Sequence, residues 1–278
     1  MNNYLKKLRN AMHYVTTRCM SPLYYCYFSV QAVLRRKINK KRYDELMQFK
    51  NKYLGKKIFL IGTGSSLTEE DVLKLKDEYT FSVNSFVLAM KDMRFEPTFY
   101  GFIDGQVMDM WGEDVLAIDK SIVFYTCKSP IKKTMVNKLR HKPNAYEFLQ
   151  KDCKIWTDFA KKLPQGFSKD ISKEVYWGYT CMYSMMQIIA YMGFSEVYLL
   201  GMDCIYAPGK RDFRDCRDEK TIKEGSYGGG IVPGFIKAWE AVEKYTRDMD
   251  IKIYNATRGG MLEVFERANL DDILENKS

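Results

Sequence analysis

The sequence predicts an α/β fold in which a mostly parallel, twisted sheet carries helices on both faces. Short apolar runs of strand length alternate along the chain with longer segments of helical periodicity. This alternation is typical of parallel sheets, because each helix returns the chain to the edge where the next strand begins. The 278 residues suffice for one such domain with an appendage.

Six short apolar runs are predicted to be strands. Turn residues bound most of them, and β-branched and aromatic residues are frequent inside them. The runs are 57–62, 80–84, 98–104, 121–127, 196–203 and 251–255. The runs 57–62 and 196–203 are predicted to be buried strands.

The segments between these strands are predicted to be helices. After the first strand, the spacing of Ser66 and Glu69 fits a capping box at a helix start. Residues 178–192 are apolar nearly all round, which predicts a helix buried on most sides. Pro233 opens a further segment with helical spacing, and helices are also expected within 131–160.

The net charge of +9 belongs to the start of the chain. Residues 1–57 hold 14 Lys or Arg and 2 acidic residues, whereas residues 58–278 hold 30 and 33. The sequence therefore divides into a basic arm, 1–56, and a nearly neutral domain, 57–278. A nucleic-acid partner is not expected, because the domain has neither the basic excess nor a nucleic-acid-binding motif.

The arm is predicted to contact an anionic membrane surface. Sixteen uncharged residues, 19–34, include several aromatic side chains, and Lys and Arg flank them. This stretch is short for a membrane span and contains Pro22, but aromatic rings and cations suit the headgroup level. The alternative is an amphipathic helical arm that packs on the domain or on a second copy of the chain, and the sequence is compatible with a homo-oligomer.

Cysteine and histidine usage points to a cytoplasmic protein without a metal site. The seven Cys are scattered without a C-x-x-C pair, and no signal peptide is recognised, so reduced thiols are expected. The two His exclude a His-rich metal site. The expected location is the cytoplasm, peripheral to the inner face of the cell membrane.

Polar residues stand at the carboxyl ends of the predicted strands. The residues that carry this pattern are Gly62, Thr63, Gly64, Ser65, Asn84, Ser85, Asp104 and Asp203. A glycine turn before a helix start can bind an anion, and parallel sheets bind ligands where their strands end. Asn84 stands where NAD-binding folds carry an acid, so NAD is disfavoured and another nucleotide is expected.

Two further segments are expected to reach this crevice. Thr180 and Cys181 begin the buried helix, and their backbone amides would face the ligand unless they serve only as a helix cap. The long polar segment 206–230 is predicted to be a lid. Tyr206 and Tyr227 flank it, and their hydroxyls would contact a phosphate unless they simply face solvent.

Four segments read IGTGSSL, VNS, GYTCMYSMMQIIAYMGFSEVYLLGMD and IYNATRGGMLEVFERANLDDIL. Together they resemble the MptE-like group, which is similar to the bacterial sialyltransferases of glycosyltransferase family 42 and to the motility-associated flagellin glycosyltransferases. The resemblance covers roughly 57–275. It implies a Rossmann-like sheet and a donor site for a CMP-activated sugar, used without a metal or other cofactor. It also implies that the strand-end residues, Thr180, Cys181 and the two lid tyrosines bind the donor.

One departure concerns the base of the reaction. The sialyltransferases carry a His before the last long helix, where this chain has Gly228, Gly229 and Gly230. Asp104 or Asp203 could take the proton from the acceptor hydroxyl instead, and the sequence does not select between them.

The preferred hypothesis is a glycosyltransferase of surface polysaccharide assembly. It would move a sialic-acid-like sugar from a CMP donor to a glycan or lipid-linked acceptor. One alternative is a pterin diphosphokinase that uses ATP and Mg²⁺, with Asp104, Asp109 and Asp203 as metal ligands. The other is a non-catalytic nucleotide-binding or scaffold protein.

Overall fold

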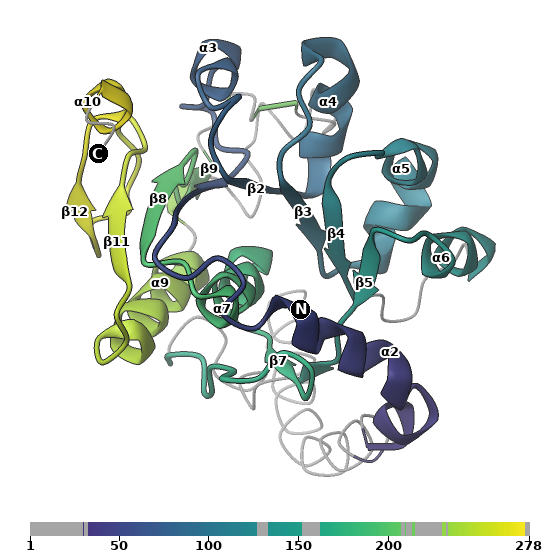
Figure 1. Ribbon diagram of the computed structural model, residues 1–278. Helices are drawn as coiled ribbons and strands as arrows, with labels where there is room; N and C mark the ends of the chain where they lie inside the picture. Colours follow the sequence, from purple (N-terminus) through teal and green to yellow (C-terminus); the bar gives the residue numbers. More distant parts are fainter. Residues whose placement is uncertain are drawn as a thin grey trace, which may run out of the picture.

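A sheet of eight strands forms the centre of the molecule (Figure 1). The computed structural model describes residues 30, 33–126, 133–151, 162–206, 209, 213–214, 230–231 and 233–275. The sheet order is β12-β11-β8-β1-β2-β3-β4-β5, and every neighbouring pair is parallel. The strands are β1 (Lys57–Ile61), β2 (Thr80–Val83), β3 (Phe99–Phe102), β4 (Ile122–Tyr125), β5 (Ala145–Glu147), β8 (Glu196–Leu200), β11 (Lys252–Asn255) and β12 (Glu266–Arg267). The predicted parallel sheet is confirmed.

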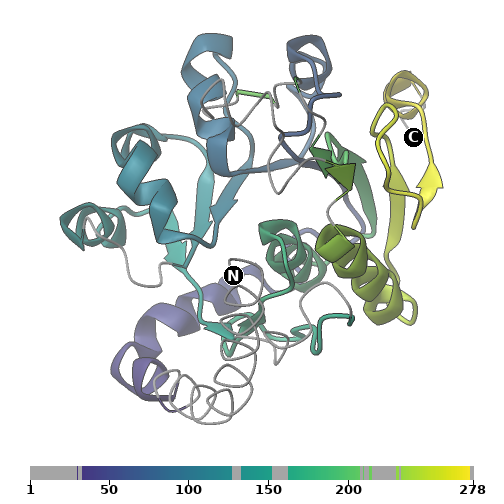
Figure 2. The ribbon, with the colours of Figure 1, turned by 180° about the vertical axis from the view of Figure 1, so that it is seen from behind.

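Helices cover both faces of the sheet. Figures 1 and 2 show α3, α4, α5 and α6 along one side, with α7 and α9 side by side on the other. The helices are α2 (Lys40–Asp44), η1 (Glu45–Phe49), α3 (Glu69–Leu73), η2 (Asn84–Phe86), α4 (Val87–Met93), α5 (Gly105–Ala117), α6 (Lys133–Arg140), α7 (Cys181–Met192), α9 (Pro233–Thr246) and α10 (Leu270–Glu275). The predicted fold class is therefore confirmed as a Rossmann-like α/β fold.

Each face of the sheet has its own apolar core. Successive residues of a strand point to opposite faces, so Ile58 and Leu60 enter the core shared with α7 and α9. Phe59 and Ile61 enter the core shared with α3 to α6. All four side chains are 0% exposed, and full burial of such a side chain contributes about 1.5–3 kcal/mol. This double burial explains the continuous apolar runs.

The six predicted strands are all present, although each is shorter than its apolar run. The edge strands β5 and β12 were not predicted, because they are only three and two residues long and contain charged side chains. Helix α6 confirms one expected helix within 131–160. The expectation is wrong at 145–151, where the chain forms β5 and the short β6 (Gln150–Lys151), which pairs with β7 (Val175–Tyr176). Residues 152–161 lie outside the described residues.

The helix after β1 has a different cap from the predicted one. Thr68 and Asp71 form the capping box of α3: Asp71 N donates to Thr68 Oγ1 at 3.2 Å, and Thr68 N donates to Asp71 Oδ2 at 3.0 Å. The predicted box of Ser66 and Glu69 is wrong. The predicted box does not form because both the amide and the hydroxyl of Ser66 donate to Asp203 instead.

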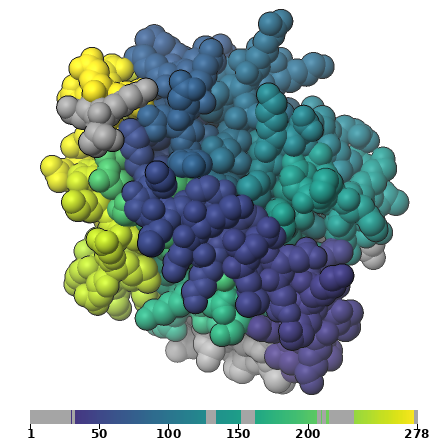
Figure 3. Space-filling model, viewed as in Figure 1, coloured from purple at the N-terminus to yellow at the C-terminus, as the bar shows by residue number. Residues whose placement is uncertain are grey.

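The described part of the arm lies against the domain. Tyr43, Leu46 and Phe49 are at most 3% exposed, and the ring of Phe49 lies 5.0 Å from that of Phe124, centroid to centroid. Figure 3 shows this purple segment on the surface, in contact with the teal and green parts of the chain. Within the described residues, no helix is both long enough and apolar enough to cross a bilayer. Residues 1–29 lie outside the described residues.

Candidate functional site

The strand order creates a switch point beside β1. From β1 the chain builds the sheet in one direction through β2 to β5, and later in the other direction through β8, β11 and β12. The strands all end at one edge of the sheet, which we call the carboxyl edge. In open parallel sheets a ligand binds at this edge where the order reverses, so the turns after β1 and β8 are the first place to look.

The glycine turn (Gly62–Ser66) follows β1 and packs directly on the turn that follows β8. Gly64 N donates to the carbonyl of Gly201 at 2.9 Å. A Cβ atom on Gly64 would lie 2.6 Å from Asp203 Cγ, and one on Gly62 would collide with the Gly201 carbonyl. This close packing by itself accounts for both glycines. Contact between their backbone and a sugar donor stays a prediction.

Asp203 holds the glycine turn in place. One oxygen of its carboxylate accepts hydrogen bonds from Ser65 Oγ and Ser66 N, each at 3.0 Å, and the other accepts from Ser66 Oγ. The residue is 5% exposed. Both carboxylate oxygens are thus engaged away from solvent, so Asp203 orients the turn. A role for Asp203 as the catalytic base stays a prediction.

The turn after β11 completes the arrangement. Thr257 Oγ1 accepts a hydrogen bond from Met202 N at 3.0 Å, and Met261 N donates to the carbonyl of Asp203 at 2.8 Å. Gly260 has a φ of +73°, and a Cβ there would lie 2.9 Å from Asp203 Cα. The turns that follow β1, β8 and β11 therefore interlock, and only glycine fits at their points of closest approach.

Arg258 lies in this third turn. Its Nη1 donates to Asp71 Oδ1 at 2.9 Å, and its Nη2 donates to Asp71 Oδ2 and, at 3.3 Å, to Thr68 Oγ1. Asp71 is 4% exposed, whereas the side chain of Arg258 is 59% exposed. The ion pair joins the start of α3 to the turn after β11 and leaves the guanidinium accessible.

A cavity of about 390 Å³ opens between these turns. Its lining residues are Ser65, Ser66, Asp203, Ile205, Arg258, Gly259 and Gly260. Ligand pockets commonly have volumes of about 300–1,000 Å³. The sequence analysis missed Arg258 and the two glycines, although a glycine pair directly after a predicted strand is the signal that could have revealed them.

A second polar group forms at the end of β2. Asn84 Nδ2 donates to Cys181 Sγ at 3.3 Å, and the carbonyl of Asn84 accepts from Tyr100 Oη at 2.7 Å. Thr180 caps α7, with its side chain accepting from Met182 N at 3.4 Å. We call Asn84, Thr180 and Cys181 the Asn84 cluster. Sequence reasoning placed these residues at one edge, and the structure joins Asn84 to Cys181.

The Cys181 thiol is unsuited to nucleophilic chemistry. Burial raises its pKa to about 11, despite the opposing hydrogen bond from Asn84. The thiol therefore stays protonated near neutral pH, and only a thiolate attacks readily. Its contribution to the site is a hydrogen bond and a fixed position for Asn84.

Three residues with unusual backbone conformation border the site. Asn84, Tyr179 and Cys204 have φ values of 50°, 65° and 55°. Positive φ is unfavourable for residues other than glycine, although Asn tolerates it well, and such residues often mark functional sites. Ser85, the next residue in the chain, is half-buried in η2. The three positions lie directly at predicted site residues or next to them.

Asp104 is set apart from these groups. It is exposed, and its Oδ1 accepts a hydrogen bond from Gln106 N at 2.9 Å as the N-cap of α5. Among the residues that the structure describes, no group of three or more His, Cys, Asp or Glu side chains is arranged to hold a metal ion.

The base of the predicted lid is a short antiparallel ladder. Strand β9 (Ile205–Tyr206) pairs with β10 (Gly230–Ile231), and Tyr206 lies opposite Gly230. The side chain of Tyr206 and the whole of Tyr227 lie outside what the structure describes. Their predicted contact with a phosphate therefore stays a prediction.

Two described residues of the predicted lid, Phe213 and Arg214, lie near the glycine turn. Phe213 N donates to the carbonyl of Thr63 at 2.9 Å, and the Phe213 ring stacks on Phe86 with centroids 5.7 Å apart. Arg214 forms an ion pair with Glu69 at the start of α3. These contacts hold Phe213 and Arg214 against the carboxyl edge beside β1.

The sheet is all-parallel and has helices on both faces, so the chain is a Rossmann-like α/β protein. Its candidate ligand site is the cavity at the switch point, on the carboxyl edge. The chain belongs to the family described as 6-hydroxymethylpterin diphosphokinase MptE-like, whose model matches residues 34–209. The predicted membership in the MptE-like group is confirmed.

The chain was also compared with curated proteins and with solved structures. No curated protein matches the chain. Among solved structures, the chain is similar to the MAf glycosyltransferase from Magnetospirillum magneticum AMB-1, with a TM-score of 0.48 and 9% sequence identity. The alignment covers 84% of this chain and 38% of that protein, so the chain spans well under half of its length. The likeness to sialyltransferases stays a prediction.

Proposed function

We propose that the chain is a glycosyltransferase that binds a CMP-activated, sialic-acid-like sugar at the carboxyl edge and transfers the sugar to a glycan or lipid-linked acceptor. The observation that supports a nucleotide-sugar site most is the cavity at the switch point. Two serine hydroxyls and the accessible Arg258 guanidinium line it. The guanidinium suits the phosphate oxygens of a nucleotide sugar. The serine hydroxyls donate to Asp203, so they can accept hydrogen bonds from hydroxyl groups of the ligand.

The Asn84 cluster supports cytosine as the base of the bound nucleotide. The Asn84 amide donates to Cys181, while within the described chain no donor reaches its Oδ1. An amide oxygen can accept from the exocyclic amine of cytosine, and an acid at this position would instead suit a ribose. Asn84 follows β2, and the glycine turn that lines the cavity follows β1. These two strands are paired in the sheet, so the cluster and the cavity lie at adjacent strand ends.

The proposed transfer is a direct displacement. The acceptor oxygen forms a bond to the anomeric carbon while the bond from that carbon to the phosphate oxygen breaks. CMP leaves with the bonding electrons, and the acceptor proton passes to a carboxylate or to the departing phosphate. Arg258 and the helix N-termini at this edge would stabilise the negative charge on CMP. Of the two predicted bases, Asp104 is the exposed one, and Asp203 is engaged by the glycine turn.

A second candidate is favoured by the description of the family. A pterin diphosphokinase would transfer a diphosphate from ATP to a pterin alcohol and would depend on Mg²⁺. Asp104, Asp109 and Asp203 are the carboxylates that this function would use, as oxygen ligands are what Mg²⁺ prefers.

Calorimetry on the full chain separates the two candidates. CMP, CDP, UDP and ATP are each titrated with and without Mg²⁺. We expect CMP to bind without metal and more tightly than ATP. Binding of ATP only with Mg²⁺, together with no binding of CMP, would refute the transferase and favour the kinase. Binding of CMP without turnover of any CMP-sugar and acceptor would favour a non-catalytic protein.

A further inference from the structure

The exposed apolar side chains of the described residues are concentrated near the start of the chain. Nine large apolar side chains are exposed, and six of them precede residue 55. These six are Val30 (53%), Val33 (56%), Leu34 (52%), Ile38 (79%), Met47 (58%) and Leu54 (71%). Single exposed apolar residues are ordinary, but such a concentration marks an interaction surface.

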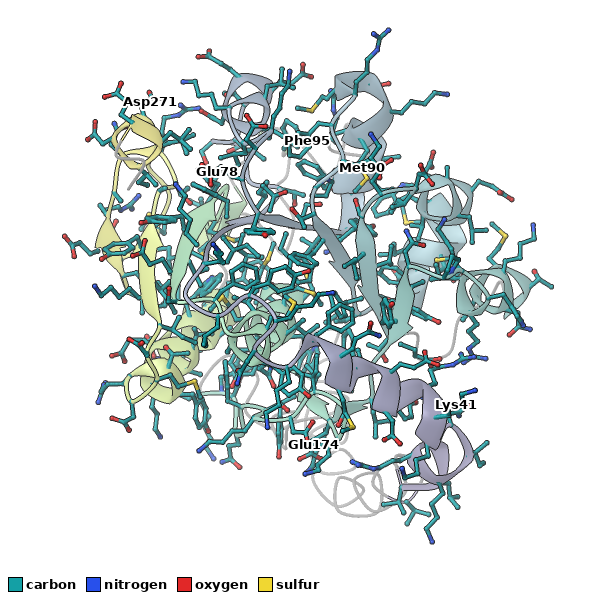
Figure 4. The ribbon with its side chains drawn as sticks, in the orientation of Figure 1. Lys41, Glu78, Met90, Phe95, Glu174 and Asp271 are labelled. Carbon is teal, nitrogen blue, oxygen red and sulfur yellow. The ribbon has the colours of Figure 1, made fainter. Side chains whose placement is uncertain are left out.

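Four of these side chains lie on one helical stretch that ends at Ile38. Leu34 and Ile38 are one helical turn apart, as are Val33 and Lys37, and Lys41 follows in the next helix, α2. Figure 4 labels Lys41 at the lower right, on the opposite side of the view from Asp271. Lysine stems can cover apolar surface while the ammonium group reaches a polar layer. We call Val30, Val33, Leu34, Lys37, Ile38 and Lys41 the arm face.

The domain holds the next helix, α2, through Arg42 and Tyr43. Arg42 forms an ion pair with Glu147 at 3.0 Å, and Glu147 is 8% exposed and also accepts from Arg140. Burial and the nearby Glu147 charge raise the pKa of Tyr43 to about 12, as expected for a phenol packed between arm and domain. The apolar side chains of the arm face stay exposed while Arg42 and Tyr43 contact the domain.

The charge of the segment selects the kind of partner. Residues 30–56 hold nine Lys or Arg and two acidic residues. A second copy of the chain would bring two sets of these cations together, whereas an anionic surface complements them. The partner must also accept aliphatic side chains, and the interface of an anionic bilayer offers both properties.

We infer that the arm face docks on an anionic lipid surface. Its aliphatic side chains enter the boundary between headgroups and acyl chains, and the lysines contact the headgroups. This surface goes beyond the proposed transfer and does not depend on it, because its residues belong to no part of the candidate site. With the domain fixed to the helix, docking holds the carboxyl edge at a set position relative to the membrane.

Vesicle flotation of the full chain tests the inference. The vesicles contain phosphatidylcholine alone or phosphatidylcholine with phosphatidylglycerol at a ratio of about 7:3. We expect flotation with the anionic vesicles and at least ~10-fold weaker binding to the neutral ones. The variant Val33→Ser with Leu34→Ser and Ile38→Ser should lose about tenfold in binding to the anionic vesicles.

Matched variants keep the test specific. Met110→Ser with Met261→Ser removes exposed apolar side chains from the domain, and it should float like the parent chain. Lys37→Glu with Lys41→Glu should bind more weakly and with a smaller dependence on salt. Lys76→Glu with Lys120→Glu makes the same charge change on exposed domain residues and should have little effect.

Two results would overturn the inference. One is equal binding of the parent chain and both arm variants to anionic vesicles. The other is a change of oligomeric mass in sedimentation for the triple serine variant with unchanged vesicle binding, which would assign the arm face to a second copy of the chain. Thermal unfolding of each variant shows whether it is folded, and the charge variant tests the same face if the serine variant unfolds.

Discussion

The carboxyl edge holds two polar groups, one around Asp203 and the other the Asn84 cluster. They differ in how many of their hydrogen-bonding atoms have a partner within the described chain. The Asp203 carboxylate accepts three hydrogen bonds from Ser65 and Ser66, and the backbone carbonyl of Asp203 accepts one from Met261 N. In the Asn84 cluster, the Asn84 amide donates to a thiol, which is a weak acceptor, and its oxygen has no donor among the described residues.

This difference separates support from recognition. A buried carboxylate with its oxygens engaged contributes to stability and fixes the shape of the turns around the cavity. A half-buried amide with an open acceptor can still exchange its hydrogen bonds with a ligand. The comparison predicts that changes at Asp203 act first on folding and that changes at Asn84 act first on binding.

The largest effect is expected from Asp203→Ala. The Ser65 and Ser66 groups would lose a charged acceptor in a site with little solvent, so the free energy of unfolding should fall by about 3 kcal/mol. Urea unfolding measures this loss. Asp104→Ala is the control, because it removes an exposed carboxylate that caps α5 and should cost only about 1 kcal/mol.

The isosteric variant Asp203→Asn sharpens the comparison. If it folds with the stability of the parent chain but abolishes sugar transfer, the carboxylate takes part in the chemistry and the division between support and recognition breaks down. Unchanged stability of Asp203→Ala would contradict the supporting role directly.

An intermediate effect is expected from Asn84→Ala. Loss of its side-chain hydrogen bonds to a bound nucleotide should weaken CMP binding by about 1.5 kcal/mol, roughly tenfold in Kd, while unfolding changes by less than about 1 kcal/mol. Calorimetry and urea unfolding give the two numbers. The control is Asn269→Ala at the start of α10, where Asn269 Oδ1 accepts from Asp271 N at 2.8 Å and no effect on binding is expected. Equal CMP affinity of parent and Asn84→Ala would place the nucleotide elsewhere.

The smallest effect concerns the pH dependence of stability and two buried thiols. One is Cys181 in the Asn84 cluster, and the other is Cys204, the residue after Asp203. Burial raises the pKa of Cys181 to about 11 and that of Cys204 to about 12, from an ordinary value of 9.0. Above pH 9 the unfolded chain releases these protons while the folded chain keeps them, so stability falls as the pH rises towards 11. Each thiol should contribute about 1 kcal/mol to the loss between about pH 8 and pH 10.

Cys181→Ala and Cys204→Ala test this one thiol at a time. Each variant should show a shallower decline in unfolding free energy than the parent chain over that pH range. A variant with the same pH dependence as the parent would mean that its thiol already meets water in the folded chain. Such a result for Cys181 alone would show that the Asn84 cluster is the more open of the two groups.

The fold was largely predictable from local patterns. Six apolar runs, the buried helix α7 and the proline at the start of α9 each follow from residues that are neighbours in the sequence. Among the strands, the failures occurred at β5, β6 and β12, which are short and partly exposed. Such strands exist because a neighbouring strand offers hydrogen bonds, and the segment itself carries no apolar period.

The site was predictable only in part, because its contacts join residues that are far apart in the sequence. The positions of Asn84, Thr180 and Asp203 at strand ends and a helix start follow from the element order, and the structure confirms their places at the carboxyl edge. That Asp203 binds Ser66, and that Asn84 meets Cys181, follows from contacts between residues 137 and 97 positions apart. Arg258 joins the cavity through its contact with Asp71, 187 positions away.

By itself, the sequence determined the order of strands and helices, the parallel sheet and the division into a basic arm and a nearly neutral domain, because apolar periodicity and charge are local properties. Only the tertiary structure decided what the polar residues do. The glycines after β1 pack on a neighbouring turn, and Asp203, one of the two aspartates considered as the base, holds the glycine turn in place. Hydrogen bonds between distant segments form only once the sheet has brought their strand ends together.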